Sequence, residues 1–157
     1  MASRAPSASG QGTESPRPRQ RAAGIAVDVN ACHGCGLCMI ACSMVHEGQA
    51  APSRARLSVD LNSFTGQHSI AYCRQCRRAA CAEACPEEAI QRGNDGVWRV
   101  EDALCSGCGA CVEACPFQAI WVSELTGTAI KCDACGGEPA CVAICPSQAL
   151  SWPGDTP

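Results

Sequence analysis

Four runs of cysteines are the residues whose spacing could do chemistry in this sequence. The third reads Cys105-x2-Cys108-x2-Cys111-x3-Cys115-Pro116, the spacing of bacterial runs that hold [4Fe–4S] clusters. A cubane cluster needs one thiolate at each of its four iron corners, and two-residue gaps let one short loop reach three of them. The fourth cysteine lies on the following helical turn, points away and ligates the cluster of another run. The spacing therefore predicts iron–sulfur chemistry shared between runs.

The sequence of 157 residues contains four such runs, which together hold all 16 of its cysteines. Run one is followed by Ser43 in place of proline, so its helix is expected to continue through residues 44–46. The other runs end in Cys-Pro, and runs two and four have a wider third gap, at residues 77–80 and 136–140. In order, the runs are Cys32, Cys35, Cys38 and Cys42; Cys73, Cys76, Cys81 and Cys85; Cys105, Cys108, Cys111 and Cys115; and Cys132, Cys135, Cys141 and Cys145.

The grouping of these thiols separates iron–sulfur binding from the other uses of cysteine. Disulfide frameworks spread their cysteines so that long loops are closed, whereas these fall into four compact groups. A zinc-binding scaffold is the stronger alternative, but zinc sites usually join two pairs across a longer gap and often include histidine. His33, His46 and His68 are scattered. We interpret them as surface or packing residues, with a hydrogen bond near a cluster as the alternative for His33.

The charge distribution argues against a nucleic-acid-binding module. The formal net charge is -3, and residues 1–23 carry four arginines against one glutamate, a net +3, which leaves -6 for the remainder. Nucleic-acid binders present a basic folded surface instead. Residues 1–23 have the composition of a disordered tail. Arg74, Arg77 and Arg78 are interpreted as surface charges, or as residues that steer a partner or tune the potential of a cluster. Lys131 is interpreted as a surface charge or a hydrogen-bond donor near the cluster of run four.

Composition also bears on compartment and activity. No stretch approaches the roughly 20 apolar residues that span a bilayer, and no secretory signal opens the sequence. Abundant thiols without an export signal predict a reducing cytoplasm. There is no Gly-rich nucleotide fingerprint and no nucleophile paired with a base, so we expect an electron-transfer protein and not an enzyme. Aromatic residues make up only 4% of the chain, so the clusters must form the core and the apo form should be largely unstructured.

Short strands and helices must position these ligands. Cys-Pro-x-x-Ala followed by Ile or Leu recurs at Cys85, Cys115 and Cys145, and this repetition indicates duplicated modules. A turn rich in Gly, Asn and Asp at residues 93–96 joins the two strands of a predicted hairpin. Further strands are predicted within residues 25–29, 56–61, 117–122 and 149–152.

The runs must be paired, because each lends its fourth cysteine to another. Runs two and three are separated by one hairpin, residues 86–104, a natural length for a compact two-cluster fold, which leaves runs one and four to pair. Pairing in sequence order, one with two and three with four, is the alternative, since residues 116–131 are also short enough. The spacing leaves both arrangements open.

Residues 25–152 resemble the four-cluster polyferredoxin subunits of molybdenum and tungsten oxidoreductases, the dimethyl-sulfoxide-reductase iron–sulfur subunit family. The resemblance lies in four runs in this order, the four-residue widening in run two, and Lys131-Cys132-Asp133 at the start of run four. No Trp replaces a cysteine, so four complete [4Fe–4S] sites are implied. The short gap at residues 136–140 and the sequence after Cys42 look like the small members that accompany tungsten aldehyde oxidoreductases, carbon-monoxide dehydrogenases or hydrogenases.

The resemblance implies an α+β fold of two nested bacterial 2[4Fe–4S] ferredoxin-like modules. The outer module would comprise residues 24–72 and 117–157, and the inner module residues 73–116. We name each cluster site by the run that supplies three ligands. The implied ligands are Cys32, Cys35, Cys38 and Cys145 for the run-one site; Cys73, Cys76, Cys81 and Cys115 for the run-two site; Cys105, Cys108, Cys111 and Cys85 for the run-three site; and Cys132, Cys135, Cys141 and Cys42 for the run-four site.

The function implied is electron relay between a catalytic subunit, favoured to be of the Mo/W-pterin type, and a second redox partner. A flavin- or NAD-linked subunit is a candidate for that second partner. Stacking of copies into a longer wire is a further expectation. Neither nucleic acid nor a membrane span is expected.

Overall fold

The computed structural model describes residues 24–61, 64–65 and 68–152. The predicted basic tail, residues 1–23, lies outside these described residues. The described part is a small mixed α/β fold of short helices and strands, as the sequence predicts. The helices are α1 (Leu37–Glu47), α2 (Ala80–Glu83), α3 (Ala110–Ala114) and α4 (Ala140–Ala143), with 3-10 turns η1 (Pro52–Arg54) and η2 (Ala134–Gly137). The prediction that the first helix continues through residues 44–46 is confirmed.

Among the described residues, the strands form antiparallel two-stranded sheets. The predicted hairpin is confirmed, with Ile90 opposite Val100 and Arg92 opposite Trp98. Strands β3 and β7 were not expected from the sequence, and the predicted strands are shorter in the structure. The pairs are β1 (Ala26–Val27) with β8 (Leu150–Ser151), β2 (Leu57–Leu61) with β3 (His68–Tyr72), β4 (Ile90–Arg92) with β5 (Trp98–Val100), and β6 (Ile120–Val122) with β7 (Ala129–Lys131).

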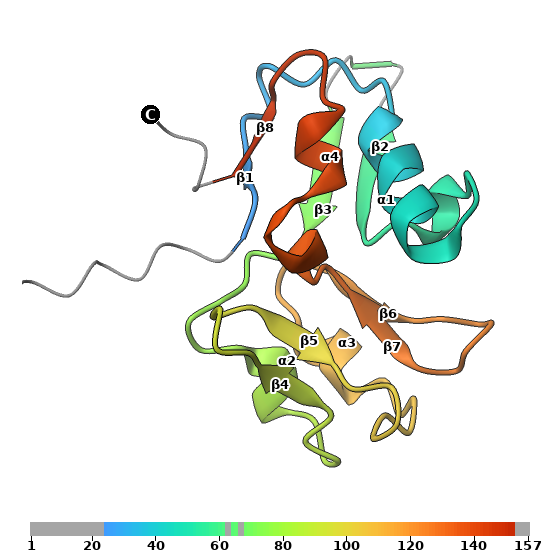
Figure 1. Cartoon of the computed structure of the whole chain (residues 1–157), viewed down its shortest axis with the longest axis vertical. Coiled ribbons are helices and arrows are strands. Elements are labelled where there is room, and N and C mark those ends of the chain that lie inside the picture. The colour runs from blue at the N-terminus through green and yellow to red at the C-terminus, as the bar shows by residue number, and fades with distance from the viewer. Residues whose placement is uncertain (1–23, 62–63, 66–67, 153–157) are drawn as a thin grey trace, which may run out of the picture.

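The elements divide into two halves along the long axis of the molecule (Figure 1). The upper half combines elements from both ends of the chain, since β1 pairs with β8 and α1 packs against α4. The lower half comes from the middle of the chain, where α2 packs against α3 and the β4–β5 and β6–β7 hairpins lie beside them. The upper half is therefore built from elements that are distant in sequence, and the lower half from one continuous middle segment.

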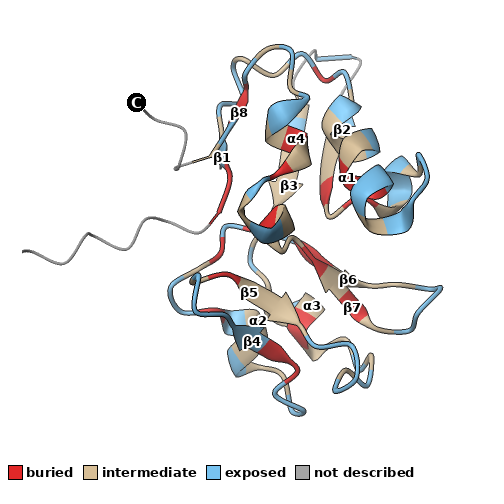
Figure 2. Ribbon diagram, in the orientation of Figure 1, coloured by how far each residue is buried: buried red, intermediate tan, exposed pale blue. Residues whose placement is uncertain are grey.

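Both halves contain buried segments (Figure 2). Each half has its own small buried cluster, and cysteines belong to both clusters. Ile120 and Ala129 pack in the lower cluster, so the core of the lower half extends beyond residue 116, the boundary expected for the inner module. The upper cluster contains Ile25, Cys42, Ala55, Leu57, Cys141 and Leu150, and the lower one Ile90, Cys111, Ile120 and Ala129. The apolar side chains in both clusters are few.

The repeated Cys-Pro segments form the same corner three times. Glu88, Gln118 and Gln148, three residues after the cysteine, all have left-handed backbone, with φ of 50°, 49° and 53°. Left-handed backbone is uncommon for residues other than glycine, and here each of these residues is followed by a buried alanine. The corner turns the chain from the helix of each run into β4, β6 or β8. None of the helices in the described ranges is long and apolar enough to cross a membrane.

Candidate iron–sulfur sites

The loops before α1 and α3 are shaped by glycines with left-handed backbone. Gly36 and Gly109, with φ of 72° and 80°, are the residues from which these helices start. Gly107 also has positive φ, and a Cβ added there would lie 2.0 Å from the carbonyl oxygen of Gly127 in the β6–β7 connection. Only glycine lets that hairpin tip approach the loop of run three so closely.

Three cavities are each lined by four of the predicted site cysteines. In every case three cysteines come from one run and the fourth from another run, at the end of a different helix. The run-one cavity contains Cys32, Cys35, Cys38 and Cys145; the run-two cavity contains Cys73, Cys76, Cys81 and Cys115; and the run-three cavity contains Cys105, Cys108, Cys111 and Cys85.

The remaining cysteines also lie close together, where α1 packs against α4. Burial, and then the charges of Cys132, Cys42 and Cys135, raise the pKa of Cys141 to about 12. Cys42 and Cys141 belong to the same buried cluster, and electrostatic coupling of this kind falls off with distance. These four thiols are the ligands predicted for the run-four site. Twelve of the sixteen predicted site residues thus line three cavities in groups of four, each with one member from a second run.

Burial is the main influence on the thiols inside the protein. It raises the pKa of Cys132 to about 12 and the pKa values of Cys42 and Cys81 to about 11. The positive charge of Lys131 opposes this rise at Cys81. Buried thiols with such pKa values become thiolates only when a cation binds them, so the donor sets fit iron centres and would be inert thiols without them.

Cys145 differs from these thiols. Burial acts to raise its pKa, but hydrogen bonds from the backbone N–H groups of Leu150, Ala149 and Ser147 and from the Ser147 hydroxyl outweigh that effect, and the pKa is lowered.

Backbone N–H groups donate to several of the other sulfurs. Arg56 donates to Cys42 Sγ at 3.2 Å, and the buried alanine of the repeated corner, Ala89, donates to Cys85 Sγ at 3.3 Å. Ala129 on β7 donates to Cys105 Sγ at 3.3 Å, which ties the β6–β7 hairpin to run three. Such hydrogen bonds stabilise negative charge on sulfur and are among the means by which proteins set cluster potentials.

The sites differ in how far they reach solvent. Cys35 and Cys108 are the exposed cysteines, and the others are buried or half-buried. These two residues occupy corresponding positions in the loops that lead into α1 and α3, and the loops lie at the top and bottom of the view in Figure 1. The run-one and run-three sites therefore have a ligand at the surface, at opposite ends of the molecule.

Sequence reasoning missed a polar group around the run-four site. His46, interpreted as a surface or packing residue, has Nε2 3.6 Å from Cys135 Sγ and 3.5 Å from Asp133 Oδ1. Arg56 Nη1 donates to Asp133 Oδ2 at 2.8 Å. Burial and then the charge of Arg56 lower the pKa of His46, so the imidazole is neutral near pH 7 and donates through one nitrogen. The i, i+4 spacing of Cys42 and His46 on one helix face could have indicated this contact.

The outcome for the other polar candidates is mixed. His33 is exposed and His68 is half-buried on β3. Arg74, Arg77 and Arg78 are exposed, as surface charges would be, and Arg74 stacks over the Phe117 ring at 4.2 Å. The surface-charge interpretation of Lys131 is wrong. Its side chain is buried and donates a hydrogen bond to the carbonyl oxygen of Cys132.

Comparison with known proteins assigns this chemistry to a family. Residues 66–154 match the family described as "4Fe-4S dicluster domain", and residues 30–45 match a "4Fe-4S binding domain". "Hydrogenase-4 component A" of Escherichia coli (strain K12) is 34% identical over 77 residues, which is 49% of this chain and 36% of that protein. "Aliphatic sulfonate oxidoreductase, polyferredoxin-like subunit" of Pyrococcus furiosus is 37% identical over 87 residues, 55% of this chain and 50% of that protein.

These matches span half or less of the length of the two curated relatives. Among solved structures, "Active site complex BamBC of Benzoyl Coenzyme A reductase in complex with Benzoyl-CoA" is similar with a TM-score of 0.48 and 26% identity, over 81% of this chain and 75% of that one. The family match alone covers more than half of the 157 residues. The chain therefore belongs to the 4Fe-4S dicluster domain family.

Proposed function

We propose that this chain holds four [4Fe–4S] clusters and relays electrons within an oxidoreductase complex. The observation that supports this most strongly is the set of cavities lined by four cysteines, three from one run and one from another. When bound, each cluster takes up and releases one electron. The protein holds the clusters in place, screens the inner ones from water, and donates hydrogen bonds to their ligand sulfurs.

The proposed ligand sets are the nested ones, with runs one and four in an outer module and runs two and three in an inner module. The packing of Ile120 and Ala129 in the lower half favours an inner module that extends to Lys131. Two electrostatic contacts indicate the order of the sites. Cys38 influences the pKa of Cys141, and Cys73 that of Cys132. With α1 packed against α4 and α2 against α3, the proposed order is run-one, run-four, run-two and run-three.

This order places the two sites with an exposed ligand at the ends of the series. Electrons would enter and leave through the loops that carry Cys35 and Cys108, since tunnelling to a partner is most effective where a cluster lies nearest the surface. One end would face a catalytic subunit, for which the Mo/W-pterin type remains our choice, and the other a second redox protein or another copy of this chain. Electron transfer to or from a hydrogenase is the competing function, and the similarity to Hydrogenase-4 component A favours it.

The cluster content is tested by anaerobic purification followed by iron and sulfide analysis. We expect about 16 iron atoms and as much sulfide per chain, because each cubane holds four of each. Zinc without sulfide would overturn the proposal. Co-purification of the tagged chain from its own host then identifies the partner, and a chain that carries clusters but elutes alone would argue against a role within a complex.

Double variants test the nested ligand sets. Under nesting, Cys145→Ser and Cys38→Ser affect the same cluster, so the double variant should lose no more iron than the more severe single variant. The matched control combines Cys145→Ser with Cys108→Ser and should lose two clusters. If the runs instead pair in sequence order, Cys108 and Cys145 are ligands of the same cluster, and the control double variant should lose only one cluster.

A further inference from the structure

Lys131, at the end of β7, is a buried cation without a carboxylate partner. Its side chain is 3% exposed, and Lys131 takes part in none of the ion pairs found within the described ranges. The ammonium Nζ donates to the carbonyl oxygens of Trp98 at 2.6 Å and Cys132 at 3.2 Å. Carbonyl dipoles satisfy its hydrogen bonds but do not neutralise its charge. Burial of an unpaired charge is costly, so a counter-ion is required.

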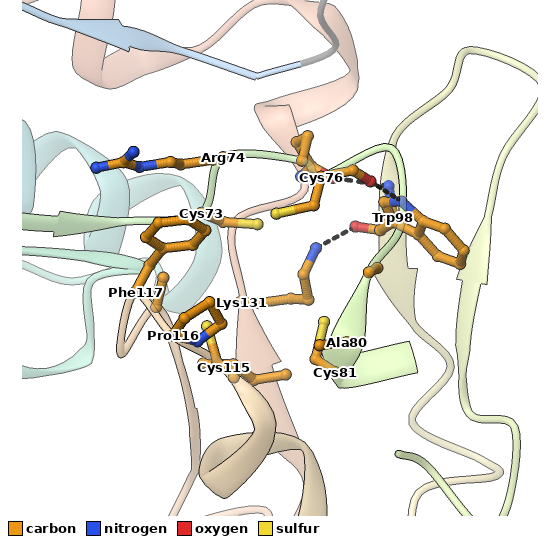
Figure 3. Close-up of a pocket in the computed structure, with 14 residues that line it drawn as sticks. Cys73, Arg74, Cys76, Ala80, Cys81, Trp98, Cys115, Pro116, Phe117 and Lys131 are labelled. Carbon is orange, nitrogen blue, oxygen red and sulfur yellow. Dashed lines mark hydrogen bonds between the residues drawn. The ribbon is translucent and has the colours of Figure 1, made fainter. Parts of the chain in front are cut away.

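The run-two cavity is where that counter-ion would sit. Lys131 lines it together with Cys73, Cys76, Cys81 and Cys115. Figure 3 shows the lysine side chain amid these sulfurs, with its ammonium directed to the Trp98 carbonyl. Four thiolates around an iron–sulfur core make a net anion, and the cavity lining contributes no carboxylate.

Gln75 holds the lysine in this place. Its side-chain Nε2 donates to the carbonyl oxygen of Cys132 at 2.7 Å, and its Oε1 accepts from the backbone N–H of Trp98 at 2.8 Å. Gln75 and Lys131 therefore contact the same two residues, and both are buried. Buried hydrogen bonds of this kind restrain both side chains, so the ammonium has little freedom to move away from the cavity.

We propose that Lys131 is the built-in counter-ion of the run-two cluster and raises its reduction potential. The inference rests on the proposed function, because it requires a cluster at that site. With the clusters bound, reduction of the run-two cluster would take one electron from the preceding cluster, which would be oxidised. Since reduction adds one negative charge, the nearby cation stabilises the reduced form more than the oxidised form. Burial limits screening by salt.

The test is an anaerobic redox titration of the full chain, followed by electron paramagnetic resonance. Comparison with Cys81→Ser assigns the signal of the run-two cluster. We expect Lys131→Met to shift the reduction equilibrium of that cluster at least tenfold toward the oxidised form, which is about 59 mV for a one-electron couple. Lys131→Arg, which keeps the positive charge, should leave the reduction equilibrium of that cluster close to the wild-type value. Arg78→Gln removes a highly exposed cation from run two. It should change the reduction equilibrium of the run-two cluster by less than about threefold, because water and salt screen that charge.

The outcomes separate the inference from the function on which it rests. If the wild-type chain lacks iron and sulfide, the proposed function fails. If Lys131→Met keeps its full iron content and the reduction equilibrium of every cluster differs from that of the wild type by less than about threefold, the counter-ion proposal fails alone. If Lys131→Met and Lys131→Gln both lose the run-two cluster while Lys131→Arg retains it, the charge is needed to hold the cluster and the proposal stands. Loss in all three variants would indicate a packing role and overturn it.

Discussion

The hydroxyl group of Ser43 accepts a hydrogen bond from the backbone N–H of Ala51 at 2.9 Å and donates one to the carbonyl oxygen of Ile40 at 3.0 Å. Ser43 is fully buried and follows the last cysteine of run one, the position that proline occupies in the other runs. In the other runs, proline is followed by a turn of the chain into a strand. Ser43 instead lets α1 continue, and its hydroxyl binds Ala51 in the segment that follows this helix.

Ser43→Ala should therefore destabilise the upper half. Removal of the hydroxyl leaves the Ala51 N–H without its acceptor, which costs about 1–3 kcal/mol. The measurement is the temperature at which the visible absorption of the bound clusters is lost on heating. Ser69→Ala, at an exposed position on β3, is the control and should leave that temperature unchanged. Equal behaviour of the two variants would mean that the Ser43 contact contributes nothing.

Gly107→Ala should impair the run-three site. The added methyl group would lie 2.0 Å from the Gly127 carbonyl oxygen, so either the β6–β7 tip or the cysteine loop must move. Gly109→Ala is a close control, because it has a similar φ of 80° but open space around the new methyl group. We expect the first variant to lose about a quarter of the iron, one cluster of four, and the second to lose much less. Similar losses would assign the effect to backbone conformation instead of the close approach.

The sequence predicted the local structure around the cysteines better than their surroundings. Spacing within the runs specified the cysteine loops and the helices after them, because these are interactions between near neighbours. The strands β3 and β7 escaped prediction because they are defined mainly by the partner strand to which they bond.

The burial of Lys131 escaped prediction for a similar reason. Trp98 contacts it from 33 positions away, and Gln75 reaches the Cys132 carbonyl across 57 positions. Such contacts leave no periodic signal in the sequence. The pairing of runs could be chosen from resemblance only, whereas three cavities of the structure each bring together cysteines from two runs.

His46→Leu should lower the reduction potential of the run-four cluster. A proton on His46 Nε2 has two acceptors nearby, Cys135 Sγ at 3.6 Å and Asp133 Oδ1 at 3.5 Å. A donor to a ligand sulfur stabilises the more negative, reduced cluster, and its loss favours the oxidised form. The potential is read from the same anaerobic titration, with His33→Leu, at an exposed loop position, as control. An unchanged potential in His46→Leu would show that the imidazole does not donate to the sulfur when the cluster is bound.

Removal of iron should unfold both halves. The buried clusters of side chains contain cysteines, and the apolar residues that complete them are few. Without iron, the buried thiols would lose the cations that bind them together. The small apolar surface that remains does not offset the conformational entropy lost on folding. We expect a strong iron chelator, under anaerobic conditions with a thiol reductant, to abolish most of the far-ultraviolet circular dichroism.

Re-addition of ferrous iron and sulfide should restore the folded spectrum together with the visible absorption, whereas zinc should not restore the native cluster absorption. The two signals are expected to fall and return in parallel, because cluster assembly and folding are one process in this chain. A chain that keeps its folded spectrum after the iron is gone would show that the short strands and helices pack without the clusters, and that the cysteines serve the electron path alone.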